Sequence, residues 1–362
     1  MQVLAALSGG VDSSVAAALL AEEGHEVIGV TMRLWGGESD TGCCSVADVE
    51  DARRAAAQLG VDHHVFNFSD EFDEFVVGPY VADHAAGRTP NPCVECNRHL
   101  KFDVLLERAE LLGVDAVATG HHARVHTHAD GTRRVARGAD PAKDQSYVLY
   151  PLTSADLARV RFPIGHLTKA EVRERAHALG LRTAAKPDSQ DVCFITRTGG
   201  REEFLGRRIP LHPGRVVDTA GRDLGTTEAV ELVTIGQRRG LGLAGGADRR
   251  FVVDVDVPGR TVTVGPPERL LARGVDLDRM VWADREVTGP LLAQFSAHGE
   301  ALPATVEPGQ RGTASVRWNE PQRRVAPGQS VVLYDGDTVV GGGLAARSPA
   351  GEERSDVRGG AQ

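Results

Sequence analysis

The sequence predicts an α/β protein, in which a parallel-sheet domain is followed by two small β domains. Over the first half of the chain, short apolar segments alternate with helical patterns, as expected for a mostly parallel sheet covered on both faces. A glycine-rich segment joins the first apolar segment to the first helical one. After about Gly200 the helical periodicity weakens, and short β-rich segments separated by glycine and proline follow.

The 362 residues suffice for two or three domains of roughly 100–200 residues each. We expect the first domain at 1–200, a central β-rich domain at 201–274 and a C-terminal β-barrel-like domain at 275–348. Residues 349–362 are polar and glycine-rich, so we expect a disordered tail there.

Strands and helices alternate along the first domain. We expect strands at 3–7, 26–32, 63–68 and 115–119, and helices at 13–23, 45–59, 100–112 and 168–180. Gly60 and Gly180 fall where two of these helices should end. Thr168 and Glu171 have the spacing of a capping box. The second helix should bury one apolar side, which begins at Val46.

The two β domains are predicted from eight short segments. They lie at 214–218, 230–235, 251–257 and 261–264 in the central domain, and at 279–282, 313–318, 330–334 and 338–342 in the C-terminal domain. Short strands at this spacing are typical of small sandwiches or barrels.

The composition is that of an ordinary soluble globular protein, with 41% hydrophobic and 25% charged residues. No apolar run approaches the roughly 20 residues that span a bilayer, so we expect no membrane association. The N-terminus has no basic leader, and we therefore expect a cytoplasmic protein.

The formal net charge of −9 by itself argues against nucleic-acid binding, because phosphate contacts need basic residues. Arginines nevertheless cluster along the second half of the chain. They are Arg197, Arg201, Arg207, Arg208, Arg215, Arg238, Arg239, Arg249, Arg250, Arg323 and Arg324. These clusters indicate either a solvated surface or an RNA-binding one.

The segment Ser8-Gly9-Gly10-Val11-Asp12-Ser13-Ser14 lies between the first strand and the first helix, where open parallel sheets bind phosphates. It is not a Walker loop, because GxxxxGK[ST] is missing. It resembles the pyrophosphate loop of enzymes that cleave ATP between the α- and β-phosphates. The fold class is therefore a pyrophosphate-loop α/β domain, and the expected chemistry is adenylation, with Asp12 orienting Mg²⁺ or the phosphates. The alternative is an ordinary glycine-rich turn.

The five cysteines, an odd number, argue against a disulfide framework. Cys93 and Cys96 lie in a proline-rich segment before a helix expected at about 99–102, where a helix dipole would favour the thiolate. Cys193 lies near the end of the first domain. For Cys43 and Cys44 we expect local packing.

Two chemistries fit the separated thiols. In one, a cysteine carries a persulfide and a second cysteine attacks it. In the other, Cys93, Cys96 and Cys193 hold an iron–sulfur cluster with one open iron. A zinc site is a third option, but it lacks an evident fourth ligand.

Several motifs together resemble one family, the bacterial tRNA-specific 2-thiouridylases. They are SGGVDSS at 8–14, GCCS at 42–45, GRTPNPCVECN at 87–97, ATGHHAR at 118–124, KDQSYVLY at 143–150, DSQDVCFI at 188–195 and IGQRRGLG at 235–242. Their order and spacing agree with the family up to about Gly343. The third and sixth motifs are the most specific.

The resemblance implies ATP-dependent 2-thiolation of the wobble uridine in tRNAs for Lys, Glu and Gln, with sulfur from a cysteine desulfurase or a relay protein. It implies that Cys193 carries the persulfide and that Cys96 is the nucleophile. The implied ATP site comprises Ala6, Leu7, Ser8, Gly9, Gly10, Val11, Asp12, Ser13, Met32 and Gly120. The implied tRNA contacts are Asn91, Pro92, Cys93, His121, Lys143, Asp144, Gln145, Arg317, Trp318 and Gln329.

Cys93 departs from the family, because many members carry Asp there. A thiol is a poorer base but a better soft-metal ligand, which favours a cluster or pairing with Cys96. Trp318 could cover RNA or serve as a core aromatic residue. Two rival functions are an amidating synthetase, for which no ammonia source is evident, and a non-catalytic tRNA-binding protein.

Overall fold

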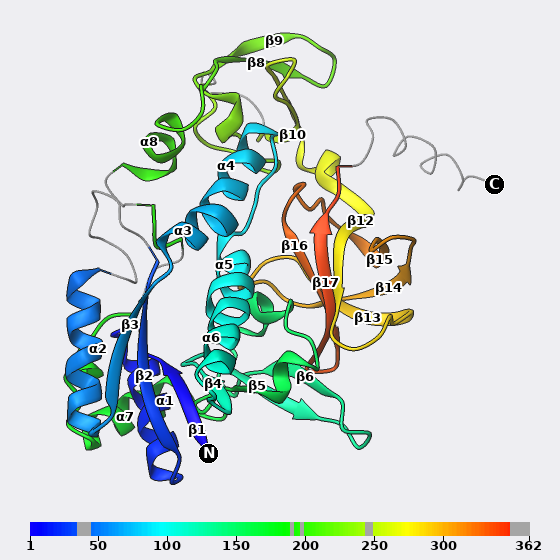
Figure 1. The fold of residues 1–362 in the computed structure, drawn as a ribbon. Coiled ribbons are helices and arrows are strands. Elements are labelled where there is room, and N and C mark those ends of the chain that lie inside the picture. The colour runs from blue at the N-terminus through cyan, green and yellow to red at the C-terminus, as the bar shows by residue number, and fades with distance from the viewer. Residues whose placement is uncertain (35–44, 189–191, 196–198, 243–248, 348–362) are drawn as a thin grey trace.

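The computed structural model describes residues 1–34, 45–188, 192–195, 199–242 and 249–347 (Figure 1). The expectations for Cys43 and Cys44 and for the tail at 349–362 lie outside the described residues.

The first domain is built on a five-stranded sheet in the order β3-β2-β1-β4-β7, with every neighbouring pair parallel. Its strands are β1 (Gln2–Ala6), β2 (Glu26–Arg33), β3 (Asp62–Asn67), β4 (Ala116–Ala118) and β7 (Val160–Arg161). The predicted parallel sheet is therefore confirmed.

Helices cover both faces of this sheet because the side chains of β1 alternate. Val3 and Ala5 pack against α1 (Val11–Glu22) and α2 (Val46–Leu59), whereas Leu4 packs against α6 (Leu105–Leu111) on the other face. Helix α7 (Lys169–Ala178) packs outside α1, so α1 is apolar nearly all round.

The predicted helix signals mostly hold. Thr168 and Glu171 form the capping box of α7, and Gly60 ends α2 in the left-handed conformation. One detail was wrong: Val46 is 72% exposed. It is the first residue of α2, whereas the buried side of the helix begins about two turns later at Ala52.

A column of helices crosses the middle of the molecule (Figure 1). It consists of α3 (Ser69–Phe72), a π-helical stretch (Asp73–Val77), α4 (Gly78–Ala85), α5 (Pro92–Glu95), a second π-helical stretch (Cys96–Val104) and α6 (Leu105–Leu111). The helix predicted at 100–112 therefore starts eight residues early, at Pro92. Asn91 caps it by accepting a hydrogen bond from the Cys93 N–H, and proline suits the first turn.

The central domain begins with α8 (Gly200–Gly206) and contains a four-stranded sheet in the order β10-β11-β8-β9. Its strands are β8 (Gly214–Asp218), β9 (Asp223–Thr227), β10 (Phe251–Asp256) and β11 (Thr261–Gly265). The strand predicted at 230–235 was wrong. Val230–Leu232 is a 3-10 turn, because the Glu231 carboxylate accepts hydrogen bonds from the backbone and ring of His212 and holds the chain in a bend.

The C-terminal domain belongs to an eight-stranded sheet that a further pairing of β12 with β17 closes. Six strands come from this domain: β12 (Leu271–Trp282), β13 (Gly289–Gln294), β14 (Leu302–Pro308), β15 (Ala314–Arg323), β16 (Ser330–Asp335) and β17 (Thr338–Ala345). The other two, β5 (Ala123–Thr127) and β6 (Arg133–Arg137), form a hairpin of the first domain. The two predicted β domains are confirmed, but this shared hairpin was not foreseen.

Four further 3-10 turns complete the described elements. They are Ser146–Leu149, Asp156–Ala158, Arg182–Ala185 and Pro267–Leu270. Within the described ranges, no helix combines the length and apolar composition that crossing a bilayer requires.

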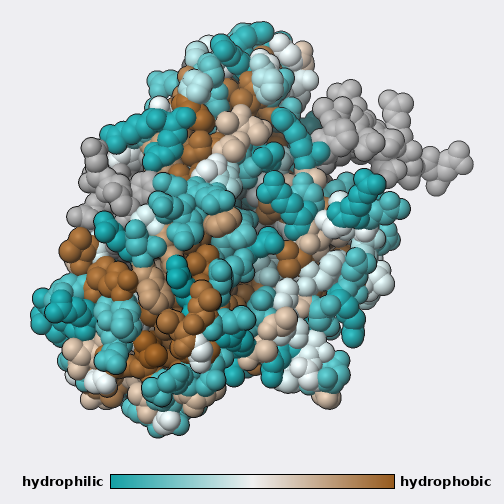
Figure 2. All heavy atoms as spheres, viewed as in Figure 1, coloured by the Kyte–Doolittle hydropathy of each residue, from teal (hydrophilic) through white to brown (hydrophobic). Residues whose placement is uncertain are grey.

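The surface seen in Figure 2 is mostly hydrophilic, with hydrophobic residues gathered over β2, β3 and α6. β3 is an edge strand, and its Val65 is exposed, as is Leu111 at the end of α6.

Candidate active site

The glycine-rich segment follows β1 at the carboxyl edge of the sheet and leads into α1. Gly10 is the N-cap of α1 and has no side chain to bind the first N–H groups of the helix. Ser13 Oγ accepts a hydrogen bond from the Ser8 N–H at 3.1 Å, and Ser14 Oγ donates to the Gly10 carbonyl at 2.9 Å. The loop is thus held by its own hydroxyls, and the helix start, which has no side-chain cap, can receive an anion.

Two glycines allow the loop to pack closely against its neighbours. Gly9 has φ +71°, and a Cβ there would lie 2.3 Å from the carbonyl oxygen of Asp48 in α2. A Cβ on Gly120, which follows β4, would lie 2.5 Å from the backbone nitrogen of Ser13. The structure therefore brings Gly120 to the loop, as the resemblance implied.

The Asp12 carboxylate, inside the loop, forms an ion pair with Lys169. It accepts hydrogen bonds from Lys169 Nζ at 2.7 and 2.8 Å and lies 3.2 Å from His122 Nε2. Burial alone would raise the pKa of Asp12, but the hydrogen bonds from His122 and Lys169 outweigh it and lower the pKa. Asp12 is therefore an anion in the loop.

Lys169 also binds Asp188, five residues before Cys193, at 2.9 Å. Lys143 Nζ and Arg173 donate to the same carboxylate, at 2.8 and 2.9 Å. Burial would raise the pKa of Asp188, but the hydrogen bonds and charges of Lys143 and Lys169 lower it to about 2. Lys169 thus joins the loop to the segment that carries Cys193.

Lys186 holds the loop from another side. Its ammonium donates to the Gly9 carbonyl at 3.0 Å and to Asp48 and Asp51 at 2.7 Å each. Burial alone would lower the pKa of Lys186, but the hydrogen bonds to the two carboxylates raise it.

Lys169 and Lys186 were not predicted as site residues. The chain contains only four lysines, Lys101, Lys143, Lys169 and Lys186, against 37 arginines. Three of the four bind the loop or the carboxylates around it. Because an ammonium is a compact point charge that suits phosphate, this scarcity was a usable signal in the sequence.

The remaining residues of the predicted ATP site frame the loop. Ala6, Leu7 and Val11 are buried, and the Leu7 N–H donates to the Val30 carbonyl at 2.7 Å. Thr31 Oγ1 donates to the Leu7 carbonyl at 2.8 Å and keeps β1 and β2 in register there. Met32, beside it on β2, packs against the sheet core and against the aromatic cluster that contains Cys96.

Cys96 and Cys193 lie in the same hydrophobic cluster. Cys96 is 8% exposed and belongs to the cluster, whose other members include Phe72, Tyr80 and Phe194. Cys193 is half-buried and packs against it. The Phe194 ring makes edge contacts with Phe72 and Tyr80, at centroid distances of 5.6 and 5.4 Å. Two cysteines almost a hundred residues apart in sequence therefore pack against one hydrophobic cluster.

The iron–sulfur hypothesis does not fit this arrangement. Within the part of the chain that the structure describes, no three His, Cys, Asp or Glu side chains gather closely enough to hold a metal. Cys93 is half-buried in the first turn of α5, one helical turn before Cys96.

His121 is buried at the end of β4, between the rings of Phe102 and Phe162. Thr119 Oγ1 lies 2.7 Å from His121 Nδ1. Burial lowers the pKa of His121 well below its ordinary value, so the ring is neutral.

Asp144 and Gln145 make contacts inside the protein. Asp144 accepts hydrogen bonds from Arg137, from the N–H of Gly138, and from the backbone and hydroxyl of Ser146. Gln145 Oε1 accepts the N–H of His122 at 2.9 Å. Both residues thus support the framework around the loop, whereas Lys143 is exposed beside them.

The C-terminal residues of the predicted tRNA site separate in the same way. Arg317 is exposed on β15, and Gln329 is half-buried in a turn. Trp318 is 6% exposed and packs in the barrel core, 5.7 Å from the Phe295 ring. Of the two roles considered for Trp318, the structure supports the core aromatic.

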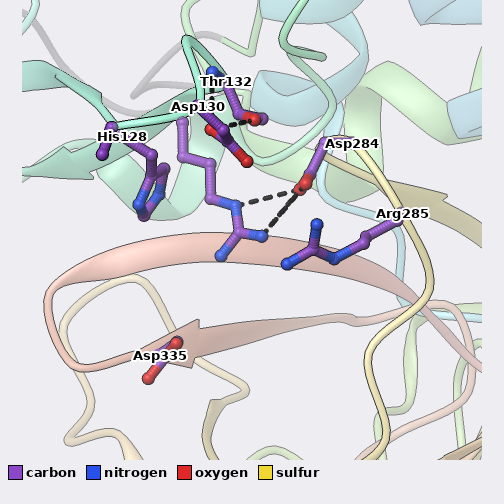
Figure 3. A pocket seen from close by; sticks show the side chains of 8 residues that line it. His128, Asp130, Thr132, Asp284, Arg285 and Asp335 are labelled. Carbon is purple, nitrogen blue, oxygen red and sulfur yellow. Dashed lines mark hydrogen bonds and ion pairs between the residues drawn. The ribbon is translucent and has the colours of Figure 1, made fainter.

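A pocket of about 390 Å³ lies elsewhere, between the β5–β6 hairpin and the barrel (Figure 3). Arg134 forms a bidentate pair with Asp284 on its wall, and Arg285 lies beside them (Figure 3). None of the predicted site residues lines it.

Three family models match the chain. Residues 1–197 match the tRNA methyl transferase HUP domain, residues 202–266 the tRNA methyl transferase PRC-barrel domain, and residues 273–345 the aminomethyltransferase beta-barrel domain.

Relatives match at nearly full length. A tRNA-specific 2-thiouridylase MnmA of Roseiflexus sp. (strain RS-1) is 46% identical over 376 residues, covering 96% of this chain and 99% of the relative. The protein of the same name from Geobacter metallireducens is 46% identical over 359 residues, covering 94% and 96%.

Among solved structures, a 4-thiouridine synthetase in complex with RNA and bound ATP covers 52% of this chain and 44% of that one, at 19% identity and a TM-score of 0.36. This likeness is too weak to build on. The identity and coverage of the relatives are sufficient, and the chain belongs to the tRNA-specific 2-thiouridylase family.

Proposed function

We propose that the protein is an ATP-dependent tRNA-uridine 2-sulfurtransferase, which converts the wobble uridine of tRNAs for Lys, Glu and Gln to 2-thiouridine. The names of its relatives support this activity. The observation that carries it is the position of Lys169. This residue binds Asp12 in the loop and Asp188, which precedes Cys193 by five residues, and this supports a thiol site beside the nucleotide site.

The first step is adenylation of the base. The 2-oxygen of uridine is part of a urea-like carbonyl, which is a poor electrophile. Attack of this oxygen on the α-phosphorus of ATP releases pyrophosphate and leaves AMP bonded to the base as a good leaving group. The N–H groups at the start of α1 and the ammonium of Lys169 would bind the phosphates.

Mg²⁺ would be held at Asp12, an ionised carboxylate in the loop and a suitable oxygen ligand for this ion. When bound, Mg²⁺ neutralises charge on the phosphates. In this structure the Lys169 ammonium is paired with the Asp12 carboxylate. If Mg²⁺ bound Asp12 instead, the ammonium could pair with a phosphate.

The second step is sulfur transfer. A cysteine desulfurase or a relay protein loads Cys193 with a persulfide. The Cys96 thiolate attacks the Cys193 sulfur, which forms a disulfide between the two and releases hydrosulfide. Hydrosulfide attacks C2 of the activated base and expels AMP. An external thiol then reduces the disulfide by two electrons. The shared aromatic cluster supports this pairing of Cys96 with Cys193.

The tRNA would be bound along the edge that carries the loop and helix α5, which contains Cys93 and leads into Cys96. Asn91, Cys93 and Lys143 are proposed around the base and its neighbours, whereas Pro92 and His121 are buried and would shape the surface from beneath. Arg317 and Gln329 are proposed on the barrel. Asp144, Gln145 and Trp318 act through the framework instead, because their side chains are engaged inside the protein. We assign the enzyme to the cytoplasm, where tRNA is available.

The test is incubation with ATP, Mg²⁺, a persulfide donor and bulk tRNA, followed by nucleoside mass spectrometry. The wild-type chain should form 2-thiouridine, and Cys193→Ser should form none while still binding ATP. Leu111→Ser, at an exposed position at the end of α6 that has no role in the proposed site, is the control and should stay active. Absence of 2-thiouridine with the wild-type chain would refute the function, whereas its persistence in Cys193→Ser would remove only that cysteine.

A further inference from the structure

The clustered arginines serve different purposes in the structure. Four of them donate to backbone carbonyls: Arg201 to Leu232, Arg208 to Phe204, Arg323 to Gly236 and Arg324 to Val253. Arg323 and Arg324 bind the barrel to the central domain, as does Arg347, outside these clusters, which donates to Val255. Arg207 and Arg215 are exposed but neutralised by Glu203 and Asp223. These residues are therefore not available to bind an anion.

Arg238 and Arg239 differ from all of these. Both are exposed, and neither guanidinium has a hydrogen-bond or ion-pair partner among the residues that the structure describes. Arg249 and Arg250 immediately precede the adjoining strand β10 and likewise have no such partner among the described residues. In a chain of net charge −9, this is a local concentration of unneutralised positive charge.

The turn that carries Arg238 and Arg239, residues 234–240, is held rigidly. The Gln237 side chain accepts the N–H of Thr234 at 3.1 Å and donates to the Arg239 carbonyl at 2.8 Å. The backbone of the turn pairs with β10, because Gly236 donates to Val252 at 2.7 Å and Val252 donates to Gln237 at 2.9 Å. A preorganised backbone leaves only the two side chains to be ordered on binding.

The turn also lies next to the segment that leads to the cysteines. Thr234 Oγ1 and Thr89 Oγ1 are 3.4 Å apart, and Thr89 precedes Asn91, the cap of α5, by two residues. The Thr89 N–H donates to the Pro327 carbonyl at 2.7 Å, so the three domains meet here. Arg238 is four residues from Thr234, which is at most about 14 Å of extended chain.

We propose that the turn at 234–240 binds the phosphate backbone of the tRNA whose base enters the active site, with Arg238 and Arg239 as the contacts. This assignment rests on the proposed function. A guanidinium suits a phosphate because it can donate two parallel hydrogen bonds. RNA is favoured over an acidic protein, because a base near Cys96 must carry its neighbouring phosphates past the adjoining surface.

The test measures tRNA affinity at several salt concentrations for the wild-type chain, for Arg238→Ala/Arg239→Ala and for Arg207→Ala/Arg215→Ala. The last is a matched control, since its arginines are exposed on the same domain but paired. Each phosphate contact contributes about 0.7–0.9 to the slope of log K against log salt. The first variant should bind more weakly and lose about 1.4–1.8 of slope, whereas the control should match the wild type. ATP binding should be unchanged in both.

An unchanged slope in Arg238→Ala/Arg239→Ala, with 2-thiouridine still formed by the wild-type chain, would overturn this proposal and leave the proposed function standing. Unchanged tRNA affinity with slower sulfur loading from a protein donor would assign the turn to that donor instead, and would also overturn it. A wild-type chain that binds no tRNA would overturn both proposals.

Discussion

Lys169 is the residue that most directly connects the two halves of the site. Its ammonium lies between the carboxylates of Asp12 and Asp188, at 2.7 and 2.9 Å. Both carboxyls have pKa values below their ordinary 3.8, and that of Asp188 is about 2. Because these pKa values are depressed, the ion pairs stabilise the folded protein fully above pH 3.8, and their contribution is lost as the pH falls toward 2.

Lys169→Met should therefore unfold at a lower urea concentration than the wild type near neutral pH. The difference between the two should narrow as the pH falls through 3.8 toward 2, since the carboxylates then become neutral in both proteins. Urea midpoints measured across this range test the prediction. In an Asp188→Asn background the effect of Lys169→Met should be smaller, and a difference that grows in acid would contradict the assignment.

Residue-level reasoning from the sequence named Asp12 and Lys143 in this network, but not the other two lysines or Asp188. Asp12 was evident because it lies within a contiguous motif. Lys169 and Lys186 lie more than 150 residues from the loop, and only folding brings them to it. Their distance along the chain hides them, although the scarcity of lysine pointed to them.

At the scale of elements, the loop depends on close packing between β4 and the start of α1. Gly120 has no Cβ, and a Cβ there would lie 2.5 Å from the Ser13 nitrogen and 2.7 Å from the Asp12 carbonyl carbon. These are backbone atoms, so they cannot move aside without moving the loop.

Gly120→Ala should therefore displace the loop and weaken ATP binding by about tenfold or more, which corresponds to roughly 1.4 kcal/mol. Binding of tRNA should change little, because the barrel and the central domain are untouched. Gly206→Ala in α8 is a matched control, as its Cβ would make only an ordinary contact at 3.4 Å. Calorimetric titration with ATP compares the two, and equal affinities would contradict the packing argument.

The start of helix α5, which carries Cys93, shows where the prediction of helix boundaries from sequence fails. The expected start near 99 was wrong because two prolines suggested a loop, yet Pro92 occupies the first turn and Asn91 caps it. The π-helical stretch that begins at Cys96 has no sequence signal of its own. It shifts the helix register between the thiols and the anchoring core residues Phe102 and Leu105.

At the scale of the whole molecule, the barrel is attached to the first domain through the β5–β6 hairpin. Thr338 of β17 pairs with Ala136 of β6. The Arg134–Asp284 pair is almost buried, with both side chains at most 12% exposed. Arg137 donates to Gln294 and to Asp144 and lies 4.0 Å from the centre of the Tyr334 ring. The first domain and the barrel therefore form one continuous structure.

Arg134→Met should destabilise this attachment by about 3–5 kcal/mol, because it leaves the Asp284 carboxylate buried without a cation. Arg134→Met/Asp284→Leu should be destabilised less than the single variant, since it removes both charges. Thermal unfolding of the two variants and the wild type gives the comparison. A double variant less stable than the single one would show that the pair itself supplies the stability.

The sequence by itself determined the parallel sheet, the nucleotide loop and the family, because each depends on contiguous residues or on local periodicity. Only the tertiary structure decided that three of four lysines bind around the loop, that Cys96 and Cys193 share a cluster, and that a first-domain hairpin extends the barrel. Each of these is a contact between segments far apart in the chain. Such contacts arise from the joint packing of all elements and leave no local pattern to read.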